Sequence, residues 1–259
     1  MRWLRLNTAN KQIYDEKWAV WSDMKIYGPK SRWLRDLIMS CLRNTTSCSV
    51  RDILDVGCGE GSNTNFLHEH FNCNATGIDI SETGIQVSKN NYCDKSNMHF
   101  YTTEEMPIYE IDKKFDLVSC FEVLEHEDDW QTLLSQIIDV SRRYVLLSFP
   151  TGRMRPFEVH VGHVRNFKKG EVENFMFQNG FKAVYICYAG FPFYSPVYRN
   201  ICNFFDISHA KFAGSGKYGL KQRMICSLTY AFFRYLSTQR KHGDAFCGLF
   251  ELNDIVEMS

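Results

Sequence analysis

Three glycines at alternate positions stand ahead of an aspartate that ends the next apolar run. Gly57, Gly59 and Gly61 follow the apolar run 53–56, and the polar run 62–65 follows them. Glycine allows backbone angles closed to other residues and leaves room for a ligand against the main chain. A helix that begins here directs its free N–H groups at the occupant of the turn. Asp79 comes about 20 residues later, the spacing at which a second-strand carboxylate meets a pair of ribose hydroxyls.

A second group of residues that could do chemistry combines carboxylates with imidazoles. Glu122, Glu125 and His126 lie within one turn, and His160 and His163 come later in the chain. A histidine suits proton abstraction near neutral pH, so His126, His160 and His163 are candidate bases. Two carboxylates and an imidazole also suit a hard cation, while the same string equally suits an ordinary helix start. The sequence leaves these three interpretations open.

A local basic region follows the second group. Its members are Arg153, Arg155, Arg165, Lys168 and Lys169. Solvated surface charge is the ordinary explanation for such a region. The alternative is recognition of a phosphate or carboxylate on the substrate, since the guanidinium fork matches such groups.

Alternating apolar segments predict the elements that must position these residues. Strands are expected at 51–56, 75–80, 98–102, 115–120, 144–149 and 181–188, and helices at 62–70, 82–91, 129–140 and 168–179. Ser81 is expected to cap the helix 82–91. This alternation indicates a parallel sheet with helices on both faces, whose ligands lie at the carboxyl ends of the strands.

Two further regions are expected to frame the site. Residues 1–45 are predicted to form helices that cover the ligand, with aromatic residues Tyr14, Trp18, Trp21 and Tyr27 packed on the domain or over the ligand. Pro29 suits the first turn of a helix at 30–43. Residues 189–244 break the alternation and are read as an insertion over the acceptor. Within it the helix 221–237 is expected to bury its apolar residues as part of a lid, with contact to a lipid-linked acceptor as the alternative. Residues 245–252 read as a last strand.

Four segments together resemble the class I S-adenosylmethionine-dependent methyltransferases. They are Leu54–Gly61, Gly77–Ser81, Phe115–Val118 continuing to Glu122–His126, and His163–Phe167 continuing to Asn179–Phe181. The resemblance implies an α/β fold with a Rossmann-like seven-stranded sheet of order 3-2-1-4-5-7-6, the last strand antiparallel. A nicotinamide dinucleotide site is disfavoured, because the glycine spacing is Gly-x-Gly-x-Gly.

The resemblance also implies a role for individual residues toward S-adenosyl-L-methionine and its product S-adenosyl-L-homocysteine. Asp55 and the backbone of Gly57, Gly59 and Gly61 are expected to hold the methionine portion. Asp79 is expected to accept the ribose hydroxyls and Ile80 to pack on the adenine. The remaining expected contacts are Thr102, Thr103 or Glu104 to the adenine amino group, and Phe121 and Glu122 near the sulfonium. The Glu-x-x-Glu-His string resembles the metal set of small-RNA 3′-end and ubiquinone-pathway methyltransferases, although relatives without metal carry it too. Glu122, Glu125 and His126 are therefore candidate metal ligands, but no metal is assigned.

Composition narrows the function classes. Thirty basic and thirty acidic residues cancel, which argues against DNA or an anionic membrane as a partner of the whole surface. Ten scattered cysteines, an N-terminus without a long apolar core and no run long enough to span a bilayer favour a cytoplasmic protein with reduced thiols. The resemblance implies a single-domain methyltransferase, which we expect to act on oxygen of a small molecule, such as a sugar, an anionic compound or a natural-product intermediate. The alternatives are a nucleoside-binding pseudo-enzyme and an RNA methyltransferase.

Overall fold

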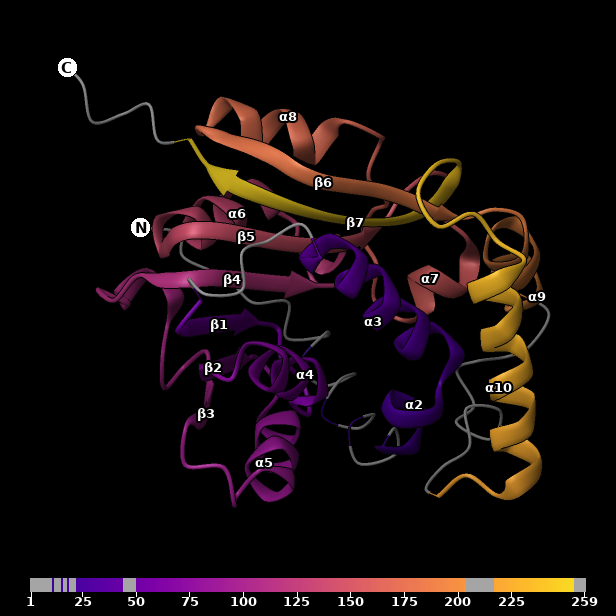
Figure 1. The fold of residues 1–259 in the computed structure, drawn as a ribbon, viewed down its shortest axis with the longest axis horizontal. Coiled ribbons are helices and arrows are strands. Elements are labelled where there is room, and N and C mark those ends of the chain that lie inside the picture. Colours follow the sequence, from indigo (N-terminus) through magenta and orange to yellow (C-terminus); the bar gives the residue numbers. More distant parts are fainter. Residues whose placement is uncertain are drawn as a thin grey trace.

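One mixed sheet forms the centre of the molecule (Figure 1). The computed structural model describes residues 11, 15, 18, 22–43, 50–203 and 217–253. In this part of the chain the sheet has seven strands in the order β3-β2-β1-β4-β5-β7-β6, as expected. The strands β1 to β5 are parallel, and β7 lies antiparallel between β5 and β6. The bounds are β1 (Asp52–Val56), β2 (Asn74–Asp79), β3 (Met98–Thr102), β4 (Phe115–Phe121), β5 (Ser141–Pro150), β6 (Phe181–Gly190) and β7 (Gly243–Leu252).

Helices cover both faces of this sheet because the central strands are apolar on both sides. Successive residues of a strand face opposite ways, so Leu146 joins the core under α3 and Leu147 joins the core under α6. The helices are α2 (Ser22–Tyr27), α3 (Pro29–Leu42), α4 (Ser62–Phe71), α5 (Glu82–Asn91), α6 (Trp130–Asp139), α7 (Pro156–His160), α8 (Glu171–Gln178), α9 (Arg199–Ile201) and α10 (Leu220–Tyr235). Short helical turns are η2 (Ile108–Glu110), η3 (Leu124–His126) and η4 (Phe193–Tyr198).

Local signals in the sequence set the start of two helices. Ser81 precedes α5, and its hydroxyl accepts a hydrogen bond from the backbone N–H of Gly84 at 3.0 Å. Pro29 occupies the first turn of α3, where its missing N–H costs nothing. Both predictions are confirmed. The short elements α7, η4 and α9 lie in segments without clear periodicity and were not predicted from the sequence.

The helix α10 contradicts the expectation of a buried lid helix. Phe233 is its one buried residue, whereas Leu220, Met224, Ile225 and Leu228 are exposed. In Figure 1 the helix runs along one side of the molecule, beside α3 and away from the sheet. Its apolar side chains are therefore directed outward.

Two further observations concern the covalent and hydrophobic character of the chain. The nine cysteines within the described residues form no disulfide. The same residues contain no helix that is long and apolar enough to cross a membrane. Tyr14 and Trp21, expected to pack on the domain, lie outside the described residues.

Candidate functional site

The glycine turn joins the end of β1 to the start of α4. Gly57, Gly59 and Gly61 all have positive φ, which explains why this turn contains glycine at alternate positions. A Cβ placed on Gly59 would lie 2.4 Å from the indole of Trp18. The ring of Trp18 therefore packs directly against the main chain of the turn, from a part of the N-terminal region that was expected to cover the ligand.

Asp79 lies at the carboxyl end of β2, beside this turn. Its two carboxylate oxygens accept hydrogen bonds from the backbone N–H groups of Gly59 and Ser81, each at 2.8 Å. Burial raises the pKa of Asp79, although these two donors oppose the shift. The side chain borders a cavity between Ile78 and Ile80. A carboxylate held between apolar walls offers acceptors for a diol and a surface for a flat ring.

The cavity has a volume of about 670 Å³ and extends from the glycine turn to the carboxyl ends of β4 and β5. This volume lies within the range of small-molecule sites. Seven of the residues expected to touch the cofactor line it: Gly57, Asp79, Ile80, Thr103, Glu104, Phe121 and Glu122. Four others do not line it: Asp55, Gly59, Gly61 and Thr102. Sequence patterns thus identify the rim of the cavity but do not separate lining residues from those behind them.

Asp55 and Thr102 are occupied by contacts within the protein. The carboxylate of Asp55 accepts hydrogen bonds from the hydroxyls of Thr64 at 2.6 Å and Ser119 at 2.7 Å. Burial raises the pKa of Asp55 to about 6 in spite of these donors. The backbone N–H of Thr102 donates to the Glu105 carboxylate at 2.7 Å. Next to it, Thr103 and Glu104 line the cavity, as the alternative assignment for the adenine contact requires.

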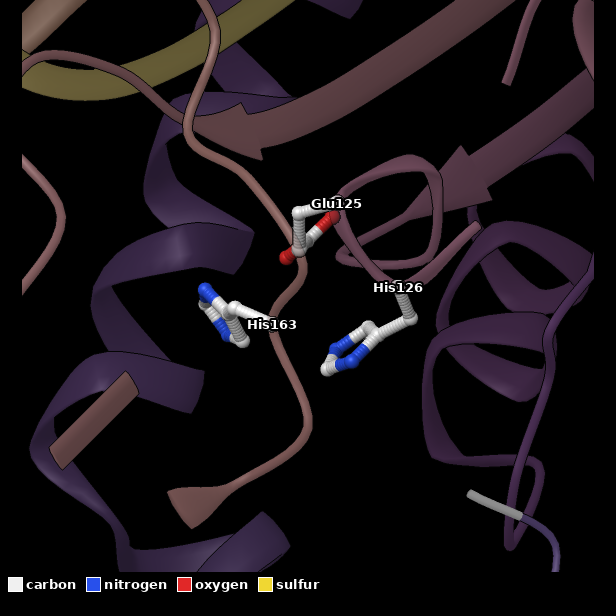
Figure 2. Close-up of side chains that lie close together, drawn as sticks. All are labelled: Glu125, His126 and His163. Atoms are coloured by element: carbon white, nitrogen blue, oxygen red, sulfur yellow. The ribbon is translucent and has the colours of Figure 1, made fainter. Parts of the chain in front are cut away.

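Glu125, His126 and His163 form a cluster at the other end of the cavity. One ligand atom from each lies within 4.8 Å of the others. Figure 2 shows the Glu125 carboxylate and the two imidazole rings close together, with His163 on a separate segment of the chain. The rings of His126 and His163 meet edge to face with centroids 4.7 Å apart. The sequence predicted each histidine separately, and the fold brings two of them to the carboxylate.

The carboxylate of Glu125 is completely buried, and neither of its oxygens has a hydrogen-bond partner. Burial, together with the nearby charge of Glu122, raises the pKa of Glu125 well above its ordinary value. An unsatisfied carboxyl group in such a place is costly to the folded protein. Its side chain lines the cavity.

The histidines of this cluster are held in the neutral form. Burial lowers the pKa of His126 to about 3 and that of His163 to about 4. The Nδ1 atom of His126 lies 2.9 Å from the carbonyl oxygen of Gly162, which can only accept a hydrogen bond. The proton of His126 therefore resides on Nδ1, and its lone pair is on Nε2.

Glu122 is paired with a lysine that sequence patterns did not reveal. Lys30 donates to one carboxylate oxygen of Glu122, and the Ser148 hydroxyl donates to the other at 3.2 Å. Although burial disfavours the charge, the Lys30 ammonium holds the pKa of Glu122 below its ordinary value. Lys30 follows the helix start of α3, far from Glu122 in the sequence, so no local spacing could predict the pair. Lys25, from α2, adds a second ammonium to the cavity lining.

His160 is placed outside the cavity. It is exposed at the end of α7, and its Nδ1 lies 2.8 Å from the carbonyl oxygen of Pro156. The prediction of His160 as a base next to the acceptor is therefore not supported by the geometry.

The basic region after β5 does not face the cavity either. The guanidinium of Arg155 donates to Asn200, Ser195 and the carbonyl of Arg153, and that of Arg165 donates to the carbonyl of Asp128. None of the five basic residues singled out in the sequence is among the described residues that line the cavity. The alternative interpretation, that they recognise an anionic group of the acceptor, is therefore not supported for this cavity, and solvated surface charge remains the ordinary explanation.

The segment after β6 closes the cavity instead. Tyr194, Tyr198, Arg199 and Cys202 line it from η4 and α9. Arg199 is buried and paired with Glu158 of α7, which fixes the two elements to each other. The aromatic stretch of the insertion thus supplies a wall of the cavity.

Comparison with known proteins gives matches to the same part of the chain. Residues 53–143 match the family model described as a methyltransferase domain. The O-methyltransferase cnsE of Penicillium expansum is 37% identical over 93 residues, which make up 35% of this chain and 34% of that protein. A ubiquinone biosynthesis O-methyltransferase of Coxiella burnetii is 35% identical over 86 residues, 32% of this chain and 36% of that protein. The chain thus matches about a third of the length of these relatives.

Solved structures resemble a larger share of the chain at low sequence identity. Mycolic acid cyclopropane synthase CmaA1, crystallised with SAH and CTAB, superposes with a TM-score of 0.60 at 15% identity. This superposition covers 96% of this chain and 99% of that chain. Magnesium protoporphyrin IX methyltransferase from Synechocystis PCC 6803, with bound SAH, gives a TM-score of 0.53 at 18% identity over 68% of this chain and 91% of that one. These likenesses support the fold. Residues 53–143 thus match a methyltransferase domain, and the whole chain has the fold and strand order of the class I S-adenosylmethionine-dependent methyltransferases.

Proposed function

We propose that this protein transfers the methyl group of S-adenosylmethionine to an oxygen atom of a small molecule bound in the same cavity. One observation carries the proposal: the cavity that holds Asp79 at one end holds the Glu125, His126 and His163 cluster at the other. Nearness of two bound reactants is what a methyl transfer needs most, because the sulfonium methyl is already electrophilic.

The residues present fit the cofactor. Asp79 keeps acceptor capacity for the ribose hydroxyls beside its two backbone donors, and Ile80 offers an apolar wall to the adenine. Thr103 and Glu104 stand where the adenine amino group needs an acceptor. Lys25 and Lys30 give positive charge for the carboxylate of the methionine portion, and Glu122 gives negative charge for the sulfonium. Asp55, Gly59 and Gly61 act by shaping the turn rather than by contact.

The cluster at the other end is better suited to a divalent cation than to a protein base. An imidazole with a pKa near 3 or 4 is about three units more acidic than the best general base at neutral pH. Neutral imidazoles and an unpartnered carboxylate are what a cation requires of its ligands. The contact between Nδ1 of His126 and the Gly162 carbonyl fixes the orientation of this ring beside Glu125 and His163. Glu125, His126 and His163 would hold the ion.

When bound, such an ion would lower the pKa of an acceptor hydroxyl as a Lewis acid. The chain itself orients the acceptor and excludes water. Phe157, Tyr194 and Tyr198 line the cavity and provide aromatic surface against which a flat acceptor can pack. A hydroxylated ring compound, such as a natural-product intermediate or a sugar, fits these walls. Both relatives described above are named O-methyltransferases, and they match the core of this chain. Their names agree with oxygen as the methylated atom.

Calorimetry tests the cofactor site. Asp79→Ala removes the ribose acceptor, so we expect at least about tenfold weaker binding of both S-adenosylmethionine and S-adenosylhomocysteine. Asp94→Ala, which removes an exposed carboxylate outside the cavity, is the control and should bind as the wild type does. Equal affinity in Asp79→Ala and wild type would refute the ribose assignment. Tight binding without turnover on any hydroxylated acceptor would instead assign the chain as a nucleoside-binding pseudo-enzyme.

Titration with Mg²⁺, Mn²⁺ and Zn²⁺ tests the cation site independently of activity. The chelator-treated wild type should bind one of these ions, and Glu125→Gln and His163→Gln should each lose at least about tenfold in affinity. His70→Gln, on α4, changes a histidine outside the cavity and should leave the titration unchanged. If none of the ions binds and methyl transfer survives chelation, the cluster acts without metal.

A further inference from the structure

The outer face of α10 carries a continuous row of apolar side chains. The exposed fractions are 76% for Leu220, 64% for Met224, 65% for Ile225 and 60% for Leu228. Leu220, Met224 and Leu228 recur four residues apart, and Ile225 stands three residues before Leu228, so all four share one face of the helix. The row continues at the other end of the helix with Phe232, Tyr235 and Leu236. A row of this length on a water-exposed surface marks a contact with another phase or molecule.

The opposite face of α10 holds the helix in place. Phe233 is buried against Trp33 of α3, with ring centroids 5.6 Å apart. The hydroxyl of Tyr230 donates to Asp36 at 2.7 Å, and the guanidinium of Arg234 pairs with the same carboxylate at 3.4 Å. The helix is therefore fixed to the domain on one side, and its apolar row is presented on the other.

The apolar surface continues onto the segment that closes the cavity. Phe193 of η4 stacks on Phe232 of α10 with centroids 5.5 Å apart. From the same segment Val197 and Ile201 are 43% and 44% exposed, whereas their neighbours Tyr198 and Cys202 line the cavity. The segment of η4 and α9 thus has an apolar outer surface next to α10 and an inner surface that lines the cavity.

The charge around α10 differs from that of the whole chain. Between positions 217 and 243 the sequence contains six Lys and Arg residues and no Asp or Glu, although the chain as a whole has thirty of each sign. Arg223 and Arg234 are turned to acidic residues of α2 and α3. The other four are exposed beyond or near the two ends of the helix: Lys217, Lys221, Arg240 and Lys241.

We propose that α10 docks the protein on a bilayer that contains anionic phospholipids. The helix lies in the plane of the membrane, with its apolar row at the boundary of headgroups and acyl chains. The exposed lysines and arginines at its ends meet the lipid phosphates. Both the apolar row and the local excess of positive charge are required for this kind of surface binding, and α10 has both. Docking on the membrane does not depend on the proposed methyl transfer. Only its use, the delivery of a membrane-dissolved acceptor past α9 to the cavity, rests on that proposed function.

Sedimentation of the full chain with vesicles tests the docking. We expect binding to vesicles of phosphatidylcholine with phosphatidylglycerol, and much weaker binding to phosphatidylcholine alone. The double variant Met224→Glu, Leu228→Glu should reduce the partition coefficient by about tenfold or more, since it places charge in the apolar row. The double variant Lys217→Gln, Lys221→Gln should reduce the preference for the anionic vesicles, and added salt should weaken wild-type binding in the same direction.

Phe177→Glu is the matched control, because Phe177 is also about half exposed but lies on α8, at the far side of the sheet from α10 (Figure 1). Its vesicle binding should equal that of wild type. The proposal is overturned if wild type does not sediment with anionic vesicles or if the glutamate pair on α10 sediments as wild type does. A dimer in solution that the glutamate pair dissociates, without vesicle binding, would assign the face to a second copy of the chain.

Discussion

Asp55 illustrates how one buried carboxyl group can tie stability to pH. Its folded-state pKa is raised to about 6 from an ordinary value of 3.8, because burial outweighs the donors Thr64 and Ser119. A raised acid pKa contributes stability below pH 4, and this contribution is lost as the pH rises through 6. At neutral pH the ionised group therefore costs up to about 3 kcal/mol.

We predict that Asp55→Asn raises the free energy of unfolding at about pH 7.5 by roughly 1–3 kcal/mol. The lower bound allows for a weaker contact with one of the two hydroxyls. The advantage should shrink as the pH falls and vanish near pH 4. Urea unfolding across this range measures the effect, with the exposed Asp94→Asn as a control that stays near wild type. A constant difference at all pH values would mean that titration of Asp55 is not its cause.

At the scale of single residues, sequence reasoning identified the site residues that belong to a short motif. The glycines, Asp79 and the Glu125–His126 pair belong to such motifs, and all of them border or support the cavity. Lys30 and Arg199 could not be identified, because their partners Glu122 and Glu158 lie far away in the chain. The difference between His160 and His163 was equally hidden, since it depends on how the short helix α7 turns one of them away.

At the scale of elements, the glycine turn offers a comparison between backbone strain and steric contact. Gly59 has φ +55°, and an added Cβ would lie 2.4 Å from Trp18. Gly170 has φ +86°, but an added Cβ would meet nothing closer than 3.9 Å. Both substitutions by alanine put an L residue into the left-handed region, and only the first also displaces a ring.

We predict that Gly170→Ala costs about 1–2 kcal/mol of stability, the ordinary cost of the left-handed conformation. Gly59→Ala should cost more and should also weaken S-adenosylhomocysteine binding, because the backbone N–H of Gly59 holds the Asp79 carboxylate. Thermal unfolding and calorimetry on the two variants measure both effects. Equal loss of affinity in the two variants would show that strain alone, and not the turn beside Asp79, controls binding.

Regular elements with strong periodicity were predicted within a few residues, as α5 and β3 show. The reason is that strands buried on both faces are continuous apolar runs bounded by turn residues. The orientation of α10 was predicted wrongly for a related reason. Its apolar residues have helical periodicity whether they face a protein core or another phase, and only the surrounding charge distinguishes the two.

At the scale of the whole molecule, the cavity spans two halves of the sheet. The strands β1 to β3 provide the glycine turn and Asp79, whereas β4, β5 and the segments after them provide Glu122, the histidine cluster and the aromatic wall. The two halves meet where β1 pairs with β4, from Ile53 and Leu117 onward. A substitution in the cluster of Glu125, His126 and His163 should therefore leave nucleoside binding at the other end of the cavity intact.

This division predicts the effect of S-adenosylhomocysteine on thermal unfolding. At a ligand concentration of one hundred times Kd, wild type should gain about 2.7 kcal/mol, which corresponds to a rise in Tm of roughly 5–10 °C for a chain of this size. Glu125→Gln should keep this rise and lose methyl transfer, whereas Asp79→Ala should lose at least about half of the rise at the same ligand concentration, as tenfold weaker binding requires. A carboxyl group confined to the acceptor end has no contact through which to weaken nucleoside binding. Loss of the rise in Glu125→Gln would therefore mean that the cluster supports nucleoside binding as well. Differential scanning fluorimetry with and without the ligand distinguishes these outcomes.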